Sequence, residues 1–428
     1  MTARELAFDL LLKAEASKQY SNIALDNALQ KSALSTADKN LVSALFYGVT
    51  ERRLTLDYQI KSLSNRPIDE IDVKALISLR MGLYQIIYLT RIPNHAAINE
   101  SVSLSPKKSS GFVNAILRNY LRRGTLALPN KNDTVEYLSI AYSVTAPLVK
   151  KLISVFGNDE TEKLLSAINA PTLTTLRVNT LLCDRKAMLK EIPDATPTKN
   201  APHGILVHGS VRELYGFNDG FFFVQDEASQ ICVEALGAQE NEFIMDICAC
   251  PGSKSFGAAI NMKNSGEIMA FDLHENKLSL VTSSAKRLKI DVITTKAQDG
   301  RKPIEKLFGK ANRIICDVPC SGFGVLSKKP ELRYKSPEES ASLPKIQTDI
   351  LDNACKYLKV GGTLIYSTCT VLPEENENNI NDFLSRHGEF SLEPWRVGNI
   401  YAKSGMITLL PHIHGTDGFF IAKLKRNF

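Results

Sequence analysis

The sequence predicts a multidomain protein, with an all-α helical bundle over residues 1–130, a small α/β linker module over 131–225 and an α/β domain over 226–428. Two observations support this division. Apolar residues recur at helical spacing in the first part, and short apolar strands alternate with amphipathic helices in the last. At 428 residues and 44% hydrophobic content, the chain is long enough to bury two or three cores.

The composition argues against several classes of protein. The first residues are charged and amphipathic, and no apolar run is long enough to cross a bilayer, so we expect a soluble cytoplasmic protein with no membrane partner. The eight cysteines include no C-x-x-C pair, which is unlike a disulfide scaffold or a zinc site. We therefore expect reduced thiols and no metal.

The net charge of +6 lies in the first third of the chain. Residues 1–130 contain 17 Lys and Arg against 11 Asp and Glu, whereas residues 131–428 contain 35 of each. This favours a polyanionic partner for the bundle, although an ordinary solvated helical surface explains the same charge. In the segment GFVNAILRNYLRR, Arg118, Arg122 and Arg123 fall close together on the polar side, where they are candidate phosphate contacts.

The helices of the bundle begin at a predicted capping box, formed by Thr2 and Glu5. Apolar residues at helical spacing follow it and predict a first helix with one buried face. Further helices are predicted over residues 35–49, 51–63, 72–89 and 111–123. In the linker module a helix over 146–157 precedes two short strands, 174–182 and 204–209, and no residue there indicates a particular chemistry.

The α/β domain contains five predicted strands, over residues 242–247, 266–272, 291–299, 312–319 and 361–369. Helices are predicted between several of them, over 274–290 and 344–360. This alternation predicts a parallel sheet covered on both faces, in which ligands bind outside the carboxyl ends of the strands. The chemically notable residues all follow those ends: Cys248 to Lys254, Asp272, Asp299, Asp317, Cys320 and Cys369.

The first strand and its turn indicate a nucleoside cofactor. In DICACPGSKS, Gly252 and its small neighbours allow the backbone to approach a ligand closely. Asp272 ends the next strand 20 residues later, where a carboxylate can accept hydrogen bonds from ribose hydroxyls. The pattern G-x-G-x-x-G is absent, which argues against a hydride-transfer enzyme.

Two later strands each end in a cysteine, Cys320 in DVPCSG and Cys369 in STCTV. Two exposed thiols that face a nucleoside cofactor predict covalent catalysis, and this reasoning leaves the roles of the two thiols interchangeable. The acidic segment after Cys369 begins with a proline and predicts a helix start, ahead of which a thiol can gain thiolate character. The remaining cysteines in strand or helix interiors are interpreted as inert core residues, namely Cys183, Cys232, Cys316 and Cys355.

Four segments, DICACPGSKS, DVPCSGFGVLSKKPELRY, IYSTCTVLPEENE and DGFFIAKLKR, resemble the signature segments of S-adenosylmethionine-dependent RNA cytosine-5 methyltransferases. The resemblance is closest to the bacterial Sun-type enzymes that methylate small-subunit ribosomal RNA. YGVTERRLTLDYQI, IPNHAAINESVSL and GFVNAILRNYLRR are similar to the NusB-like RNA-binding domain of those enzymes. The match runs in order over nearly the whole chain.

The resemblance implies a Rossmann-like methyltransferase domain, S-adenosylmethionine as cofactor, and ribosomal RNA as partner, either naked or within a partly assembled small subunit. By analogy Cys369 attacks carbon 6 of the cytosine and Cys320 assists breakdown of the covalent adduct. Asp317 hydrogen-bonds the cytosine edge beside the methyl donor, and Lys254 lowers a thiol pKa or contacts the substrate. The implied cofactor-binding residues are Cys248, Ala249, Cys250, Pro251, Gly252, Ser253, Lys254, Asp272 at the ribose, Asp299 near the adenine, and Asp317.

Three positions depart from the family pattern. Ser253 replaces a glycine, and if that position needs a positive φ the serine would be strained and cofactor affinity lower. Phe323 stands where a small residue or threonine is common, and Tyr334 where tryptophan is usual. Two alternatives stay open: a non-catalytic RNA-binding or ribosome-assembly protein, and a small-molecule or protein methyltransferase, which explains neither the paired thiols nor the basic bundle.

Overall fold

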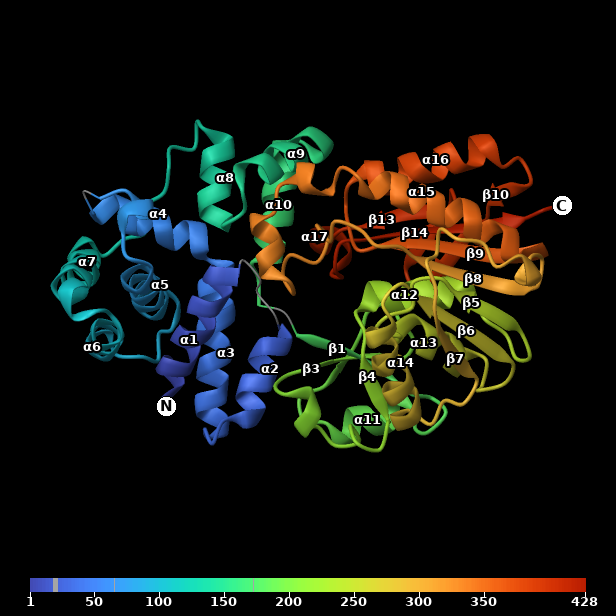
Figure 1. Ribbon diagram of the computed structural model, residues 1–428, viewed down its shortest axis with the longest axis horizontal. Coiled ribbons are helices and arrows are strands. Elements are labelled where there is room, and N and C mark those ends of the chain that lie inside the picture. Colours follow the sequence, from blue (N-terminus) through green and yellow to red (C-terminus); the bar gives the residue numbers. More distant parts are fainter. Residues whose placement is uncertain (18–21, 65, 172) are drawn as a thin grey trace. The chain divides into compact units, whose positions relative to one another are not determined.

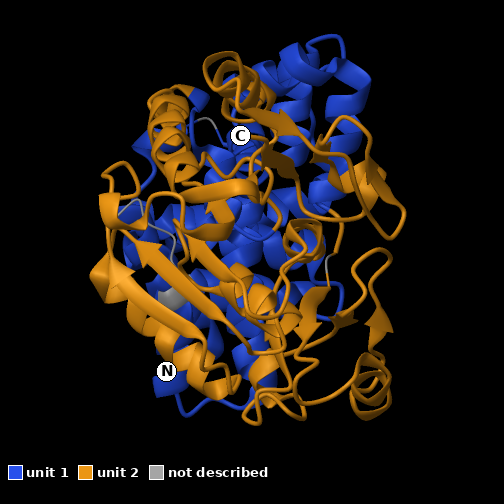
Figure 2. Cartoon of the chain, turned by 90° about the vertical axis from the view of Figure 1, so that its right-hand side faces the viewer, with its two compact units in different colours: residues 1–169, 328–337 blue, residues 170–327, 338–428 orange. Residues whose placement is uncertain are grey.

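The computed structural model describes residues 1–17, 22–64, 66–171 and 173–428. The chain forms two compact units, shown in Figure 2: unit 1 is Met1–Asn169 with Lys328–Pro337, and unit 2 is Ala170–Ser327 with Glu338–Phe428. The boundary at residue 169 falls inside the predicted linker module. The division into three domains at 130 and 225 therefore stays a prediction.

Unit 1 is helical (Figure 1). Its α-helices are α1 (Ala3–Ser17), α2 (Asn22–Lys31), α3 (Thr36–Glu51), α4 (Arg53–Leu63), α5 (Val73–Tyr88), α6 (Asn94–Leu104), α7 (Ser110–Arg123), α8 (Thr134–Tyr142), α9 (Ala146–Phe156) and α10 (Asn158–Ile168). The apolar faces of α1 to α7 enclose a core in which Leu45, Leu56 and Leu79 are fully buried. The predicted helices are confirmed, whereas α2, α6, α8 and α10 were not predicted.

The predicted capping box is present at the start of α1. The Thr2 amide donates to Glu5 Oε2 at 2.7 Å, and the Glu5 amide donates to Thr2 Oγ1 at 3.2 Å. Each side chain therefore satisfies a backbone donor that the first helical turn leaves open.

Among the described residues no single helix is long and apolar enough to span a membrane. The pair α8 and α9, which is bent by 114°, reaches the required length and apolar composition only when the two helices are taken together.

Unit 1 also contains a short segment from late in the chain, Lys328–Pro337, which includes the 3-10 helix η5 (Pro330–Tyr334). Arg333 lies in this segment and is only 1% exposed. Its guanidinium donates to three backbone carbonyls, Glu51 O at 3.3 Å, Tyr142 O at 3.5 Å and Ile168 O at 3.3 Å.

Those three carbonyls belong to the last residues of α3, α8 and α10. Carbonyls at a helix C-terminus lack an intrahelical partner and carry partial negative charge. Arg333 therefore joins three helix ends at once, and its guanidinium also donates to the side chain of Asn169. Burial lowers the pKa of Arg333, and the nearby Glu51 carboxylate acts in the opposite direction.

Tyr334, the residue that replaces the usual tryptophan, holds the same segment. Its hydroxyl accepts a hydrogen bond from the Arg53 amide at 3.1 Å, contacts Ser143 Oγ at 2.9 Å and donates to the Thr50 carbonyl. The Arg53 guanidinium lies 3.8 Å from the centre of the Tyr334 ring, in cation–π contact. An indole could donate a hydrogen bond but could not accept one from the Arg53 amide.

Unit 2 begins with a small antiparallel sheet of strand order β2-β3-β1-β4. Its strands are β1 (Thr174–Val178), β2 (Thr196–Pro197), β3 (Gly204–Val207) and β4 (Phe222–Val224), with α11 (Arg185–Glu191) packed against them. The two strands predicted for this region are β1 and β3. Leu176, Ile205 and Phe222 form its fully buried centre.

The large sheet of unit 2 has the strand order β10-β14-β9-β8-β5-β6-β7, with β13 also paired to β14. Its strands are β5 (Phe243–Asp246), β6 (Glu267–Asp272), β7 (Ile293–Ala297), β8 (Ala311–Asp317), β9 (Leu358–Thr368), β10 (Phe390–Leu392), β13 (Met406–Leu409) and β14 (Phe419–Arg426). The five predicted strands, β5 to β9, run parallel to one another, as expected. The antiparallel strands β10, β13 and β14 extend the sheet beyond that prediction.

Helices cover both faces of this sheet (Figure 1). Successive residues of a strand point to opposite faces, so Ile244 packs in the core with α12 (Glu227–Leu236), α13 (Ser253–Asn261) and α14 (Glu275–Arg287), while Met245 packs in the core with α15 (Leu343–Ala354) and α16 (Glu377–Arg386). The first strand, β5, lies between β6 and β8, so the strand order reverses there. A crevice for a ligand is expected at the carboxyl ends of these strands.

Candidate active site

The two predicted thiols lie at the ends of neighbouring strands. β8 and β9 run parallel with Asp317 opposite Ser367, so the loops that follow them emerge side by side. Cys320 Sγ and Cys369 Sγ are 3.1 Å apart, and the Cys369 amide donates to Cys320 Sγ at 3.3 Å. Both side chains are half-buried. Two residues 49 positions apart in sequence are thus in direct contact.

The loop that carries Cys320 is fixed by Glu375, which is 2% exposed. Glu375 accepts hydrogen bonds from the Ser321 amide at 2.9 Å, from Ser321 Oγ, and from Gln347 Nε2 at 2.8 Å. The helix predicted after Cys369 is α16, which begins at Glu377. Glu375 precedes that helix and binds the Cys320 loop instead of capping it.

Backbone hydrogen bonds join the two thiol loops to a third segment. The Gly324 amide donates to the Cys369 carbonyl at 2.9 Å, and the Gly418 amide donates to the Gly324 carbonyl at 2.8 Å. A Cβ atom on Gly324 would lie 1.9 Å from the Gly418 carbonyl oxygen, so the backbones meet more closely than a side chain allows. The loop after β8 is therefore held against Cys369 through its main chain.

The environment of Cys320 keeps this thiol protonated. Its hydrogen bond with Cys369 raises the pKa of Cys320 well above the usual value, and burial and the charges of Glu375 and Asp317 act in the same direction. Of the cysteines interpreted as core residues, Cys232, Cys316 and Cys355 are fully or almost fully buried, as expected. Cys183 is half-buried in the small sheet module.

A buried ion pair lies at the end of β8. Lys254 Nζ is 2.6 Å from Asp317 Oδ2, with the two side chains 7% and 32% exposed, and Ser367 Oγ donates to Asp317 Oδ1 at 2.7 Å. Burial tends to lower the pKa of Lys254, but the charge of Asp317 and its hydrogen bond to the amine raise it above the usual value. Lys254 is therefore cationic and is bound to the carboxylate of Asp317.

The predicted cofactor turn follows β5 and leads into α13. The Ala249 amide donates to the Phe271 carbonyl at 2.7 Å, and the peptide bond between Cys250 and Pro251 is cis. Gly252 has a φ of +108°, and a Cβ atom there would lie 2.4 Å from the Phe256 ring. The position that needs glycine is therefore Gly252.

The three departures from the family pattern can now be placed. Ser253 is the first residue of α13 and is not among the non-glycine residues with positive φ, so the expected backbone strain does not arise there. Phe323 is 1% exposed and packs inside unit 2. Tyr334 lies in the segment that belongs to unit 1, as described above.

The strand-end aspartates differ in their surroundings. Asp272 accepts hydrogen bonds from the Cys250 amide at 3.3 Å and the His274 amide at 3.0 Å, which orient its carboxylate beside the cofactor turn. Asp299 is engaged by Arg301, whose Nε and Nη2 lie 2.9 Å and 2.8 Å from its two carboxylate oxygens. This pairing was not predicted, and it lowers the pKa of Asp299.

Asp246, the last residue of β5, was not singled out from the sequence, although it ends a predicted strand like the other aspartates. It is 1% exposed, and Ser255 Oγ donates to its Oδ2 at 2.6 Å. Burial raises the pKa of Asp246 to about 7, and the hydrogen bond from Ser255 acts in the opposite direction. Its position at the end of the predicted strand β5 was the sequence feature that could have identified Asp246 as a candidate site residue.

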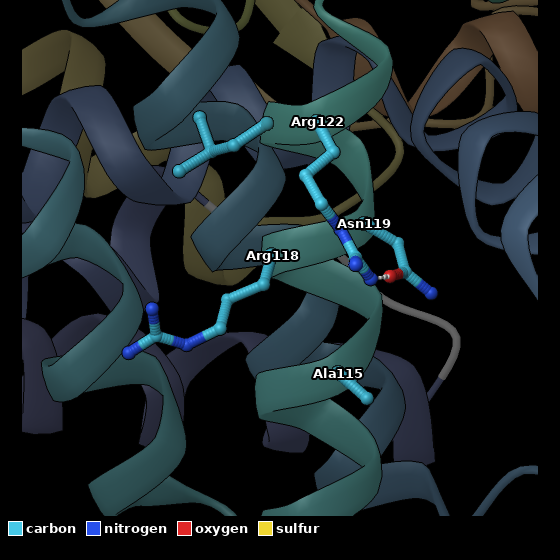
Figure 3. A pocket seen from close by; sticks show the side chains of 5 residues that line it. Ala115, Arg118, Asn119 and Arg122 are labelled. Carbon is cyan, nitrogen blue, oxygen red and sulfur yellow. Dashed lines mark hydrogen bonds between the residues drawn. The ribbon is translucent and has the colours of Figure 1, made fainter.

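In unit 1, helix α7 presents a basic pocket of about 390 Å³, shown in Figure 3. Ala115, Arg118, Asn119, Leu121 and Arg122 line it. Arg118 Nε donates to Asn114 at 3.0 Å and Arg122 donates to Asn119, so both arginines are bound by neutral amides. Arg123, predicted as a third member, instead donates to Ser62 Oγ and Gln59 Oε1, both at 2.6 Å.

The sheet order, the turn after β5 and the thiol pair define a Rossmann-like methyltransferase. Solved structures agree on the fold. A crystal structure of PH0851 matches with a TM-score of 0.81 and 25% identity, covering 100% of this chain and 99% of that one. The crystal structure of NSun6 from Pyrococcus horikoshii with SFG matches with a TM-score of 0.60 and 23% identity, covering 66% of this chain and 98% of that one.

The sequence comparisons are more specific. Residues 233–425 match the family described as 16S rRNA methyltransferase RsmB/F, residues 1–122 the NusB family, and residues 146–212 the ferredoxin-like domain of RsmF/B-like methyltransferases. The probable ribosomal RNA small subunit methyltransferase B of Bacillus subtilis (strain 168) is 35% identical over 445 residues, which cover 99% of each chain. The chain belongs to the RsmB/F family of 16S rRNA methyltransferases.

Proposed function

We propose that this protein transfers a methyl group from S-adenosylmethionine to carbon 5 of a cytosine in small-subunit (16S) ribosomal RNA, through a covalent adduct between a cysteine and carbon 6. The observation that carries the proposal is the contact of Cys320 Sγ and Cys369 Sγ at 3.1 Å, beside the buried pair of Lys254 and Asp317. Family membership and the NusB-like helices of unit 1 support an RNA substrate.

The residues around the turn after β5 fit the proposed cofactor. The backbone of residues 248–252 turns tightly, with the Gly252 amide donating to the Ala249 carbonyl at 2.6 Å, and Asp272 presents a carboxylate that two backbone amides hold in place. We assign residues 248–254 to the contact with the cofactor, Asp272 to its ribose hydroxyls, and Asp299 to the region of its adenine. When bound, S-adenosylmethionine supplies an electrophilic methyl group.

Carbon 5 of cytosine becomes nucleophilic only after a thiolate has added to carbon 6, so one thiol must attack. We assign the attack to Cys369 by family analogy. The raised pKa of Cys320 supports this order, because a protonated Cys320 is a poor nucleophile. The 3.1 Å contact lets Cys320 reach the adduct on Cys369 without a large movement.

Asp317 is assigned to the cytosine edge. Lys254 and Ser367 each bind one of its carboxylate oxygens, which fixes the carboxylate in one orientation while a third of the side chain stays exposed. A fixed acceptor of this kind can bind the exocyclic amino group of cytosine and stabilise the adduct as charge develops. Lys254 then acts by holding Asp317 and by balancing its charge.

The proposed RNA partner contacts unit 1 through its phosphates, at Arg118 and Arg122 on α7. The target cytosine would be splayed out of a loop or stack to reach the thiols, as enzymes that modify bases require. The proposed compartment is the cytoplasm, in keeping with the bacterial relatives.

The test is a trapping experiment with RNA and methyl donor. We expect a covalent protein–RNA complex that accumulates in Cys320→Ala, because breakdown is impaired, and that is absent in Cys369→Ala. Cys183→Ala, a change at a half-buried thiol in another module, is the matched control and should behave as the wild type. Accumulation in Cys369→Ala and absence in Cys320→Ala would reverse the two roles, and absence in both variants and the wild type would refute the adduct.

The alternative of a non-catalytic RNA-binding or ribosome-assembly protein was motivated by the altered turn at Ser253. Because Ser253 begins α13 and has no positive φ, the sequence change at this turn no longer supports the alternative. Calorimetry with S-adenosylmethionine separates the two: no binding at millimolar ligand would favour the alternative. Bisulfite sequencing of total RNA from cells with and without the gene would identify the methylated cytosine.

A further inference from the structure

The two active-site thiols are close enough to be joined by a covalent bond. Cys320 Sγ and Cys369 Sγ are 3.1 Å apart, and a disulfide places two sulfur atoms about 2.05 Å apart. The two sulfur atoms therefore need to approach by about 1 Å for the bond to form. The pair therefore has the proximity that a disulfide requires while both thiols are still reduced.

The backbone on both sides of the pair is fixed, so the contact does not depend on a loose loop. On one side of Cys320, the Pro319 carbonyl accepts a hydrogen bond from Gln347 Nε2 at 2.9 Å, and on the other side Ser321 is bound by Glu375. The Cys369 carbonyl accepts from the Gly324 amide at 2.9 Å. The two sulfur atoms are therefore held together before any reaction.

We propose that Cys320 and Cys369 form a site of reversible oxidation, at which a peroxide converts the two thiols into an intrachain disulfide. One thiolate attacks a peroxide oxygen, which gives a sulfenic acid and the first water when hydrogen peroxide is the oxidant. The second thiol then attacks that sulfur, the S–O bond breaks, and the second water leaves as the S–S bond forms. The two thiols lose two electrons and two protons, and the peroxide is reduced to water.

The same geometry sets the speed of the reaction. The pKa of Cys320 is raised by its hydrogen bond to Cys369, so Cys320 stays protonated at neutral pH and attacks a peroxide only slowly. The rate should increase with pH as the thiolate fraction rises. The second step is fast because the resolving thiol is already in contact, which protects the sulfenic acid from further oxidation to a sulfinic acid.

The consequence for activity rests on the proposed function, since the disulfide occupies both the attacking and the releasing thiol. The disulfide itself can be tested without RNA. The full-length protein is treated with hydrogen peroxide, blocked with iodoacetamide and digested with trypsin without reduction. We expect residues 314–328 linked to residues 360–386, with fragment ions assigning the link to Cys320 and not to Cys316 in the same peptide.

Variants and a reductant make the test specific. In Cys320→Ser, Cys369 should accumulate as sulfinic acid, whereas Cys183→Ser should give the wild-type crosslink. In the wild type, adduct formation should fall by more than about nine-tenths after peroxide and return with dithiothreitol, while calorimetric binding of S-adenosylmethionine stays within about threefold. Alkylation of both thiols after peroxide, a crosslink at other cysteines, or a link between two chains would overturn the inference. If the crosslink forms but no adduct is ever seen, only the proposed function fails.

Discussion

The buried guanidinium of Arg333 is predicted to contribute a large part of the stability of unit 1. Arg333→Met keeps the apolar stem of the side chain but removes its donors to Glu51 O, Tyr142 O and Ile168 O. A carbonyl that loses its partner in a buried place costs about 1–3 kcal/mol, and cations at a helix C-terminus contribute about 0.3–1 kcal/mol each. The relief of guanidinium desolvation offsets part of this loss.

We therefore expect a decrease of about 3–5 kcal/mol in the free energy of unfolding, similar to breaking a buried ion pair. With a urea dependence of about 2 kcal/mol per M, the unfolding midpoint of unit 1 should fall by roughly 2 M. Arg122→Met, which changes an exposed arginine of the same unit, is the control and should change stability by less than about 0.5 kcal/mol.

The chain offers a probe for each unit. Its single tryptophan, Trp395, is buried in unit 2, so indole fluorescence follows that unit, whereas circular dichroism at 222 nm reports on the helices of both units, including those of unit 1. In Arg333→Met we expect the part of the dichroism change that comes from unit 1 to move to lower urea while the fluorescence transition stays. A midpoint shift below about 0.5 M, or an equal shift in both signals, would refute the reasoning that Arg333 stabilises unit 1 specifically.

Three further predictions concern the cofactor turn, the central strand and the RNA. Gly252→Ala should weaken S-adenosylmethionine binding by more than about tenfold in calorimetry, because its Cβ would lie 2.4 Å from the Phe256 ring. Ser253→Gly should change the binding by less than about threefold, because Ser253 has no positive φ. Equal effects of the two changes would contradict the conclusion that Gly252 is the position that needs glycine. The pKa of Asp246 is raised to about 7, above the value of about 3.9 for an unfolded aspartate, so its stabilising contribution is complete below about pH 4 and is lost as pH rises through 7. Between about pH 4 and 7 the wild type should therefore lose stability relative to Asp246→Asn, as measured by urea unfolding. A stability difference that stays constant over this range would argue against the raised pKa of Asp246. Replacing Arg118 and Arg122 by Gln should reduce the slope of log K for RNA against log salt by about 1.5–2, while Lys31→Gln with Lys150→Gln, a matched loss of two exposed charges, leaves it unchanged.

The parallel strands other than β7 were predictable because each contains a short apolar run that ends in polar or small residues. β5, β8 and β9 lie inside the sheet with both faces covered, and burial leaves this continuous apolar pattern in the sequence. β14 carries lysines at alternate positions near its end, and β10 has only three residues, so neither gave a comparable signal. The thiols and the strand-end aspartates could be proposed as site residues because reactive side chains directly follow the predicted strands.

Contacts between distant residues left no such pattern. Glu375 looks like an acid at a helix start, yet its partner Ser321 lies 54 positions earlier. Three of the partners of Arg333 are backbone carbonyls, which every residue has, so nothing in the side chains of α3, α8 or α10 marks those contacts. Hydrogen bonds to backbone carbonyls therefore cannot be predicted from the types of the residues that carry those carbonyls.

The membership of Lys328–Pro337 in unit 1 has a consequence for how the protein is made. The ribosome completes Asn169, the end of the first part of unit 1, well before it reaches this segment at Lys328. At a synthesis rate of about 5–20 residues per second, the three helix ends that Arg333 joins must wait roughly 10–30 s for their cation. During that interval the carbonyls at the three helix ends lack their cationic partner. Strands β5 to β8, half of the methyltransferase sheet, must be synthesised before unit 1 can be completed.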